Sequence, residues 1–367
     1  MSGGLVQLVS KGTQDVMLTS QPETSFFRQS FKRHTNFSMF PARVLPHGTL
    51  GPNNEVSLKF QTKADLLNYV WLDLGTGSIG STLGSNTNSP TIFELYIGGQ
   101  FIDRQDATFA SAVWHKFLCD KSAKSSAIIT NDESDNTIVD KFFNGNFLPL
   151  HFFFCDGFYL PIVAMQYHEV EIRIKFGNGT NIDKLNFYAN YINLDVDERS
   201  AIVKNPVNIL IEQVQKIPSH GPSSSPKFDL SLLNHPVKCL IWGSAVERNS
   251  NLMTDDVQLY LNGSELFESR MPDKYFAHVQ PYYHSAHFSE LMKGQAGNPT
   301  LFGMKMYSFA MDASQHYPTG TCNFSRLDNA ILDLKSTTGT YTDINLWAVN
   351  FNLLRIKNGV TGLAFSN

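Results

Sequence analysis

The chain has 367 residues, of which 42% are hydrophobic and 17% are charged, and its formal net charge at neutral pH is −4. This length predicts at least two domains, and the hydrophobic share excludes a disordered chain, a coiled coil and a collagen. The acidic balance gives no electrostatic footprint for nucleic acid, so we expect no direct nucleic-acid partner. Aromatic residues make up 12% of the chain, and because Phe and Tyr favour pleated surfaces, this composition favours sheet.

The four cysteines, at positions 119, 155, 239 and 322, form no CxxC motif and no close pair. Reduced thiols are therefore expected, rather than a disulfide or zinc framework. The N-terminus lacks the pattern of a secretory signal, and the longest apolar runs, 147–155 and 158–165, are too short for a membrane span. These features predict a protein kept in a reducing compartment.

The first half of the chain predicts an arm followed by many short strands. Residues 1–24 are polar and glycine-rich, so we expect an arm that becomes ordered by docking on something. The following runs of apolar, aromatic and β-branched residues are separated by turn-forming segments. The predicted strands are 25–34, 56–62, 66–75, 91–102, 151–155, 167–177 and 185–196.

One segment has a helical period instead. Phe109, Val113 and Phe117 recur every four residues in 106–118, which predicts a short amphipathic helix capped by Asp106 or Thr108. The residues after it, through position 147, have no stable period and predict a long surface loop. That loop carries Asp132, Glu133 and Asp135.

The second half repeats the first in the same order. ELYIGGQ (94–100) returns as QLYLNGS (258–264), Trp71 corresponds to Trp242, and Pro161 corresponds to Pro318. The last strand of each half carries an asparagine before an aromatic residue, at Asn190 and Asn350. Four matches in order indicate a duplication. Each copy has the size and strand spacing of an all-β sandwich or barrel, and a jelly roll is one such arrangement.

The boundary between the copies is expected near 196–207. The segment 216–227 is rich in Pro, Gly and Ser like a linker, but it corresponds to 45–54 in the first copy. We therefore interpret it as an internal loop.

Gly75, Gly77 and Gly80 fit the G-x-G-x-x-G pattern after a predicted strand. In dinucleotide-binding proteins a helix begins there, and its N-terminus holds the pyrophosphate. The residues that follow, STLGSNTNSPT, do not suit such a helix. We expect a loop.

His278, His284 and His287 cluster shortly before Glu290. A closed metal site needs three or four placed ligands, and the aromatic residues between these histidines are typical of a packed strand end. We therefore expect no metal.

His168 and Glu169 are adjacent, so on a strand they point to opposite faces and cannot act together as an acid/base pair. Asp183, and the group formed by Asp195, Asp197 and Glu198, resemble ordinary strand-end and linker charges. No Ser-His-Asp arrangement, GxSxG or HExxH motif is present. The sequence therefore indicates no catalytic, cofactor-binding or metal-binding residue, no cofactor, and no enzyme.

Two further patterns have ordinary explanations. N-x-[ST] occurs at Asn36, Asn178, Asn262 and Asn323, which is about the number expected by chance, so we interpret all four as unmodified turn residues. Residues 26–33 mix aromatic and basic side chains, as single-strand nucleic-acid binders do. The strand period and the net acidity favour a half-buried strand with a basic outer face.

Several strings in this two-copy chain resemble the major capsid proteins of nucleocytoplasmic large DNA viruses, a group that includes iridovirus, phycodnavirus and marseillevirus relatives. The strings span nearly the whole chain in the expected order, although the chain is short for the group. They are GTQDVMLTSQPETSFFRQSFKRHTNFSMF (12–40), FELYIGGQFIDRQ (93–105), LPIVAMQYHEVEIRIKF (160–176), LIEQVQ (210–215), NHPVKCLIW (234–242) and YPTGTCNFSRLDNA (317–330).

The resemblance implies an all-β double jelly roll: two tandem eight-stranded jelly-roll β-sandwiches with a short inserted helix. The implied organisation is an N-terminal arm at 1–24, a first jelly roll at 25–199 and a second at 200–367. The implied function is a major capsid protein that forms a homotrimeric, pseudo-hexameric capsomer and tiles an icosahedral shell. No individual interface residue is assigned by it.

The implied partners are neighbouring capsomers, penton and minor capsid proteins, and the inner membrane layer, which the N-terminal arm would contact. The implied location is the virion capsid, assembled in the host cytoplasm or a viral factory. We expect the 106–118 helix and the 119–147 loop to make contacts within or above the trimer. Two alternatives stay open: a tandem jelly-roll carbohydrate-binding or host-attachment protein, and a metal-dependent cupin-like enzyme.

Overall fold

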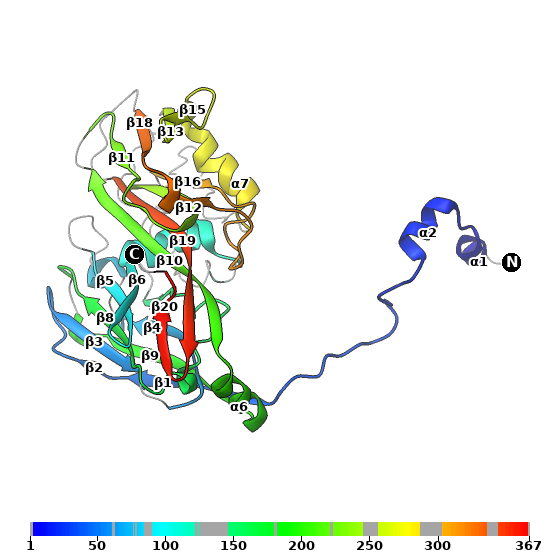
Figure 1. Ribbon diagram of the computed structural model, residues 1–367, viewed down its shortest axis with the longest axis horizontal. Coiled ribbons are helices and arrows are strands. Elements are labelled where there is room, and N and C mark those ends of the chain that lie inside the picture. Colours follow the sequence, from blue (N-terminus) through cyan, green and yellow to red (C-terminus); the bar gives the residue numbers. More distant parts are fainter. Residues whose placement is uncertain are drawn as a thin grey trace. The chain divides into compact units, whose positions relative to one another are not determined.

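The computed structural model describes residues 3–60, 63–75, 77, 79–83, 90–121, 124, 146–179, 182–220, 223–244, 256–286, 303–335 and 344–365. The chain divides into two units, Met1–Asn36 and Phe37–Asn367 (Figure 1).

The first unit contains two short helices and no sheet within its described residues. Helices α1 (Gly3–Val9) and α2 (Thr13–Thr19) bury no residue. The strand predicted at 25–34 is wrong, because this segment is irregular and Phe26 and Phe27 are 95% and 97% exposed. An isolated strand has no partner for its backbone hydrogen bonds, so alternation alone does not stabilise it.

The second unit begins with a sandwich of two antiparallel sheets. The order in one sheet is β1-β9-β4-β7, and in the other β2-β3-β8-β5-β6. The strands are β1 (Phe37–Val44), β2 (Pro46–His47), β3 (Glu55–Phe60), β4 (Leu66–Asp73), β5 (Ile92–Ile97), β6 (Gln100–Asp106), β7 (Phe147–Pro149), β8 (Val170–Lys175) and β9 (Asn186–Leu194).

These strands confirm the predictions at 56–62, 66–75, 167–177 and 185–196. The single strand predicted at 91–102 is wrong, because the chain turns at Gly98 and Gly99 and forms the hairpin of β5 and β6. The strand predicted at 151–155 is wrong, because the chain turns there and Cys155 donates its N–H to the carbonyl of Phe152 at 2.7 Å. Phe152 and Phe154 are buried. This aromatic run fills the core from a turn.

A nine-residue helix, α6 (Val196–Lys204), leads from β9 to the second sandwich. Its sheets have the orders β10-β19-β12-β16, with β17 beside β12 and β20 beside β19, and β11-β18-β13-β14, with β15 beside β13. The strands are β10 (Val207–His220), β11 (Lys227–Asp229), β12 (Pro236–Ser244), β13 (Asp256–Leu261), β14 (Ser264–Glu265), β15 (Met271–Pro272), β16 (Gly303–Ser308), β17 (Cys322–Asn323), β18 (Ala330–Lys335), β19 (Ile344–Lys357) and β20 (Val360–Leu363).

The two sandwiches have the same topology, which confirms the predicted duplication and the double jelly roll. Strands β1, β9, β4 and β7 correspond in order to β10, β19, β12 and β16. The repeated ELYIGGQ and QLYLNGS strings form equivalent hairpins, with positive φ at Gly98 and Gly99 in the first and at Asn262 and Gly263 in the second. Such two-residue turns match the twist of the flanking strands. The segment 216–227 lies inside the second jelly roll, as predicted, but its first part is not a loop, because β10 extends to His220 and β11 begins at Lys227.

The predicted helix is present as η1 (Phe109–Leu118), which is π-helical. Asp106 Oδ1 accepts the N–H of Phe109 at 2.7 Å, as its predicted capping role requires. The expected amphipathic character is wrong, because all ten residues of η1 are buried. The second jelly roll has an equivalent helical segment, η5 (Tyr275–Val279) followed by α7 (Gln280–His284). The packed strand end predicted there is therefore also wrong.

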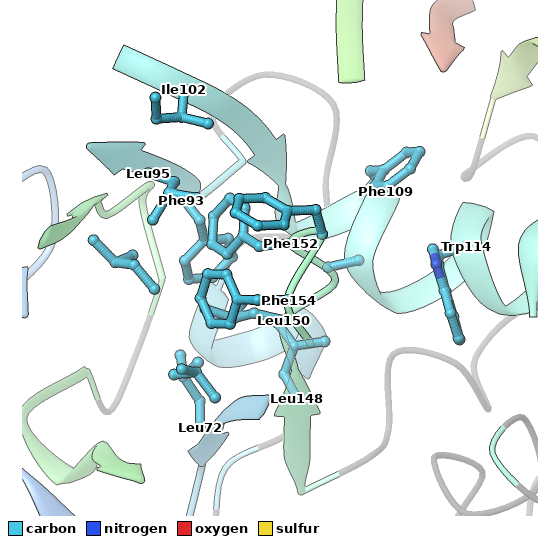
Figure 2. Packing of buried hydrophobic residues seen from close by; sticks show 14 of the residues in the cluster. Leu72, Phe93, Leu95, Ile102, Phe109, Trp114, Leu148, Leu150, Phe152 and Phe154 are labelled. Atoms are coloured by element: carbon cyan, nitrogen blue, oxygen red, sulfur yellow. The ribbon is translucent and has the colours of Figure 1, made fainter. Parts of the chain in front are cut away.

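The remaining helices are short: α3 (Ile79–Leu83), η2 (Ile162–Ala164), η3 (Ile182–Lys184) and η7 (Phe324–Arg326). The core of the first jelly roll lies between its two sheets. Figure 2 shows Leu72 of β4, Phe93 and Leu95 of β5, and Phe152 and Phe154 pointing into it.

Candidate functional site

The sheet β10-β19-β12-β16 is buried on both of its faces. Leu240 and Trp242 of β12 pack into the core of their own sandwich. Cys239 and Ile241, which alternate with them, belong to the cluster that contains the core of the first jelly roll. Because successive side chains of a strand point to opposite faces, this sheet forms the wall between the two jelly rolls. The near-continuous apolar run of β12 is explained by this double burial.

Two edge strands face each other at the junction. β6 ends one sheet of the first jelly roll, and β10 ends the central sheet of the second. Side chains bridge them: Gln213 donates to the carbonyl of Ile102, the N–H of Val214 donates to Asp103 Oδ1 at 2.8 Å, and Lys216 Nζ lies 2.6 Å from Asp106 Oδ2. The junction thus satisfies polar groups that two open edges would expose.

Asp103 is the most deeply buried acid of this junction, with 2% of its surface exposed. Burial raises the pKa of its carboxyl to about 7, although hydrogen bonds from Val214, Arg104 and Gln105 oppose the shift. Glu212 raises it slightly further by charge repulsion. The protonated form is therefore favoured at this position relative to an exposed aspartate.

A second contact joins the helices of the two jelly rolls. Lys116 Nζ of η1 donates to the carbonyl of Met304 on β16 at 3.1 Å, and Ser285 Oγ donates to the carbonyl of Phe117 at 2.9 Å. Beside them, Lys305 and Asp273 form a buried ion pair of 2.5 Å. Burial lowers the pKa of Lys116 to about 7.

The C-terminal hairpin makes a third contact. Strand β20 follows a tight turn at Asn358 and Gly359. Its Thr361 donates its N–H to His168 Nδ1 at 3.1 Å, and Leu363 donates its N–H to Gln100 Oε1 at 3.2 Å. Three separate contacts therefore lock the two jelly rolls into one block.

An aromatic-lined cavity of about 760 Å³ lies beside η1 and β7. Trp114 stacks on His151 with ring centroids 3.7 Å apart. The two ring nitrogens of His151 have different neighbours. Its Nδ1 lies 2.8 Å from Asp156 Oδ2, and its Nε2 lies 3.3 Å from Nε2 of His115. Burial lowers the pKa of His115, so its neutral form is favoured. This cluster was not identified from the sequence, because its members come from separate segments.

The N-terminal unit exposes ten large apolar side chains. Its exposed apolar side chains are Leu5, Val6, Leu8, Val9, Val16, Met17, Leu18, Phe26, Phe27 and Phe31. Apolar groups gathered without burial mark a surface that binds something.

The structure also places the motifs considered from the sequence. A one-turn helix, α3, begins after Gly77 and contains Gly80, so the loop predicted there is wrong for residues 79–83, and residues 84–89 lie outside the described residues. Ile79 and Leu83 lie four positions apart and are both buried, which anchors this turn in the core.

The histidine cluster is divided. His278 lies in η5, and His284 Nδ1 lies 3.0 Å from the carbonyl oxygen of Ala310. His287 and Glu290 lie outside the described residues, as do Asp132, Glu133 and Asp135 of the 119–147 loop. Among the described residues, no three His, Cys, Asp or Glu side chains are grouped to hold a metal ion.

His168 and Glu169 precede β8 and contact different partners, Thr361 and Lys59. Asp195 Oδ1 caps α6 by accepting the N–H of Val196 at 2.7 Å.

Asp197 and Glu198 occupy the first turn of that helix, and Asp183 lies in η3. Asn262 and Asn323 accept backbone N–H groups in a turn and at a helix start, while Asn36 and Asn178 are exposed irregular residues.

All four cysteines lie among the described residues and none forms a disulfide. In the part of the chain that the structure describes, no helix has the length and hydropathy needed to cross a membrane.

Two protein-family models match this chain. A model described as "Major capsid protein N-terminus" matches residues 25–212, and one described as "Large eukaryotic DNA virus major capsid protein" matches residues 245–362. The chain belongs to this major capsid protein family. The resemblance read from the sequence strings is thereby confirmed.

Individual relatives agree. The major capsid protein of Pyramimonas orientalis virus is 34% identical, and that of Paramecium bursaria Chlorella virus 1 is 29% identical, each over the whole of both chains. The quasi-atomic model of the PBCV-1 virus capsid matches with a TM-score of 0.71 and 26% identity, over 94% of this chain and all of that one. The Faustovirus major capsid protein has the same fold, with a TM-score of 0.63 at 11% identity, over 95% of this chain and 94% of that one.

Proposed function

We propose that this chain is a major capsid protein that builds an icosahedral virus shell from homotrimeric capsomers. The observation that carries the proposal is the junction: two jelly rolls of equal topology are locked into one block by a shared buried sheet and by polar contacts. A block of two similar lobes produces a six-lobed ring when three copies associate, and a closed ring of this kind buries side walls.

The mechanism is assembly. Association energy comes from apolar and aromatic burial between lobes, and polar rims set specificity. The family is one of structural proteins, and the proposal requires no catalysis and no cofactor.

The proposal extends to domains, partners and location. We assign the first jelly roll to 25–199 and the second to 200–367, with the arm before them. Neighbouring capsomers, penton and minor capsid proteins are the proposed partners, and the exposed apolar arm is the proposed contact to the inner membrane layer. The proposed location is the virion capsid, assembled in the host cytoplasm or a viral factory.

The test is the mass and outline of the purified protein. Light scattering on a sizing column should give about 124 kDa, three times the 41.2 kDa of one chain. Negative-stain images should show six lobes. A monomer that stays monomeric with a viral folding chaperone present, and that binds sugars, would instead support the carbohydrate-binding alternative.

A further inference from the structure

The duplication allows each surface of one jelly roll to be compared with its equivalent in the other. β17 pairs with β12 through Cys322 and Val237, as Leu160 pairs with Leu67 in the first jelly roll. Helix η7 follows the first of these bridges and η2 follows the second. The N–H of Phe324 donates to the carbonyl of His235, and that of Val163 to the carbonyl of Asp65. His235 is therefore the equivalent of Asp65.

In the first jelly roll this surface is covered by helix α6. The helix packs against η2, and its Ile202 is half-buried against the core. Both carboxylate oxygens of Asp65 help to hold helix α6 in place. One accepts the N–H of Leu194 at 2.9 Å, and the other lies 3.0 Å from Nε of Arg199.

In the second jelly roll the described chain places no helix on the equivalent surface. β19 continues to Lys357, and the chain then turns at Asn358 and Gly359 into β20. At the equivalent point of the first jelly roll, β9 is followed by α6. A groove of about 450 Å³ results. Its lining includes Leu210, His235, Asn323, Ser325, Phe351 and Leu353. Asn323 and Ser325 are exposed, whereas the η2 residues Ile162 and Ala164 are buried.

We propose that this groove binds helix α2 of a second copy of the chain in the assembled shell, in the way that α6 covers the first jelly roll. The inference rests on the proposed capsid function. The apolar lining, which includes Leu210, Phe351 and Leu353, requires an apolar occupant. Helix α2 carries Val16, Met17 and Leu18, which are 50%, 86% and 86% exposed.

The polar side chains are complementary in this arrangement, because an imidazole N–H donates and a carboxylate accepts. In the first jelly roll an acid on the floor, Asp65, pairs with a base on the helix, Arg199. In the second the floor carries His235, and α2 carries the acid Asp15 and no basic residue. The basic part of the arm, 28–33, suits the groove less well. Only α2 is proposed to bind the groove. Helix α1 and the exposed phenylalanines of the arm stay available to contact the inner layer.

The test is photo-crosslinking in particles assembled from the full-length chain. A benzophenone amino acid replaces Met17, and ¹⁴N and ¹⁵N chains are mixed in equal amounts before assembly. We expect crosslinks from position 17 to peptides that contain Leu210, Asn323 or Leu353, with half of the intermolecular products of mixed isotope.

Two variants sharpen the test. Leu210→Glu places a charge in the groove and should reduce the crosslink yield about tenfold, which corresponds to 1.4 kcal/mol. Ser38→Glu is its matched control, because Ser38 pairs with Asn193 as Leu210 pairs with Leu353. The control should leave the yield unchanged.

Crosslinks that join position 17 only to the groove of its own chain overturn the second-copy assignment. Crosslinks that avoid the groove altogether overturn the site. Either result in well-formed particles leaves the capsid function intact, whereas failure of the wild-type chain to form trimers or particles contradicts the proposed function itself.

Discussion

The turn between β5 and β6 shows how one residue position connects the two jelly rolls. Gly98 and Gly99 both have positive φ, so an alanine at either costs about 1 kcal/mol of backbone strain. A Cβ on Gly99 meets nothing within 4 Å, whereas one on Gly98 would clash with the ring of His168. We expect Gly98→Ala to destabilise the protein by roughly 1–2 kcal/mol more than Gly99→Ala, because His168 must release Thr361. Thermal unfolding of the matched pair measures this; equal losses would contradict the His168 contact.

Asp103 gives the junction a pH dependence. Its pKa rises from 3.8 to about 7 on folding, so between these values the folded state keeps a proton that the unfolded state releases. Stability contributed by this group is present below pH 4 and is lost as the pH rises to 7, by about 4 kcal/mol at most. Asp103→Asn cannot ionise. The stability of the wild type relative to this variant should therefore fall between pH 4 and 7 in thermal-shift scans, and parallel curves would refute the buried acid.

At the scale of elements, Asp106 ties the start of η1 to β10. It accepts the N–H of Phe109 and pairs with Lys216. Asp106→Asn keeps an acceptor for the helix but loses the ion pair, and we expect a cost of about 1–2 kcal/mol. Asp106→Ala loses both and should cost about 1 kcal/mol more. Denaturant titrations of the two variants separate the contributions. If the two variants lose the same stability, the capping role is wrong.

Several strands could be predicted correctly from the sequence alone. Strands β3, β4, β5, β8 and β9 follow their apolar periods, since each has one face in a local core. The helical segment η5–α7 was not predicted, although it is equivalent to η1. Its aromatic residues Tyr275, Phe276, Tyr282 and Tyr283 favour strand locally, and tertiary packing overrides that preference. Only the duplication itself, applied to 106–118, offered a signal for it.

The strand prediction at 25–34 is wrong because the segment has the local pattern of a strand but no strand of the described chain pairs with it. The junction and the groove beside η7 could not be predicted from the sequence, because they depend on which sheet edges meet. A pattern within one segment fixes the face of a strand and says nothing of its neighbour.

At the scale of the whole molecule, the N-terminal unit should be separable from folding. Helices α1 and α2 bury no residue, so removing residues 2–20 withdraws no core contact. We expect the truncated chain to keep its trimer mass and its melting temperature within about 1–2 °C. Particle assembly should fail or slow severely, because the exposed apolar residues of the arm, Val16, Met17 and Leu18 among them, lose their binding partners. Sizing with light scattering and electron microscopy of assembly reactions measure the two effects separately. Normal particles from the truncated chain would show that the arm is dispensable, and a loss of the trimer would place the arm inside the capsomer instead.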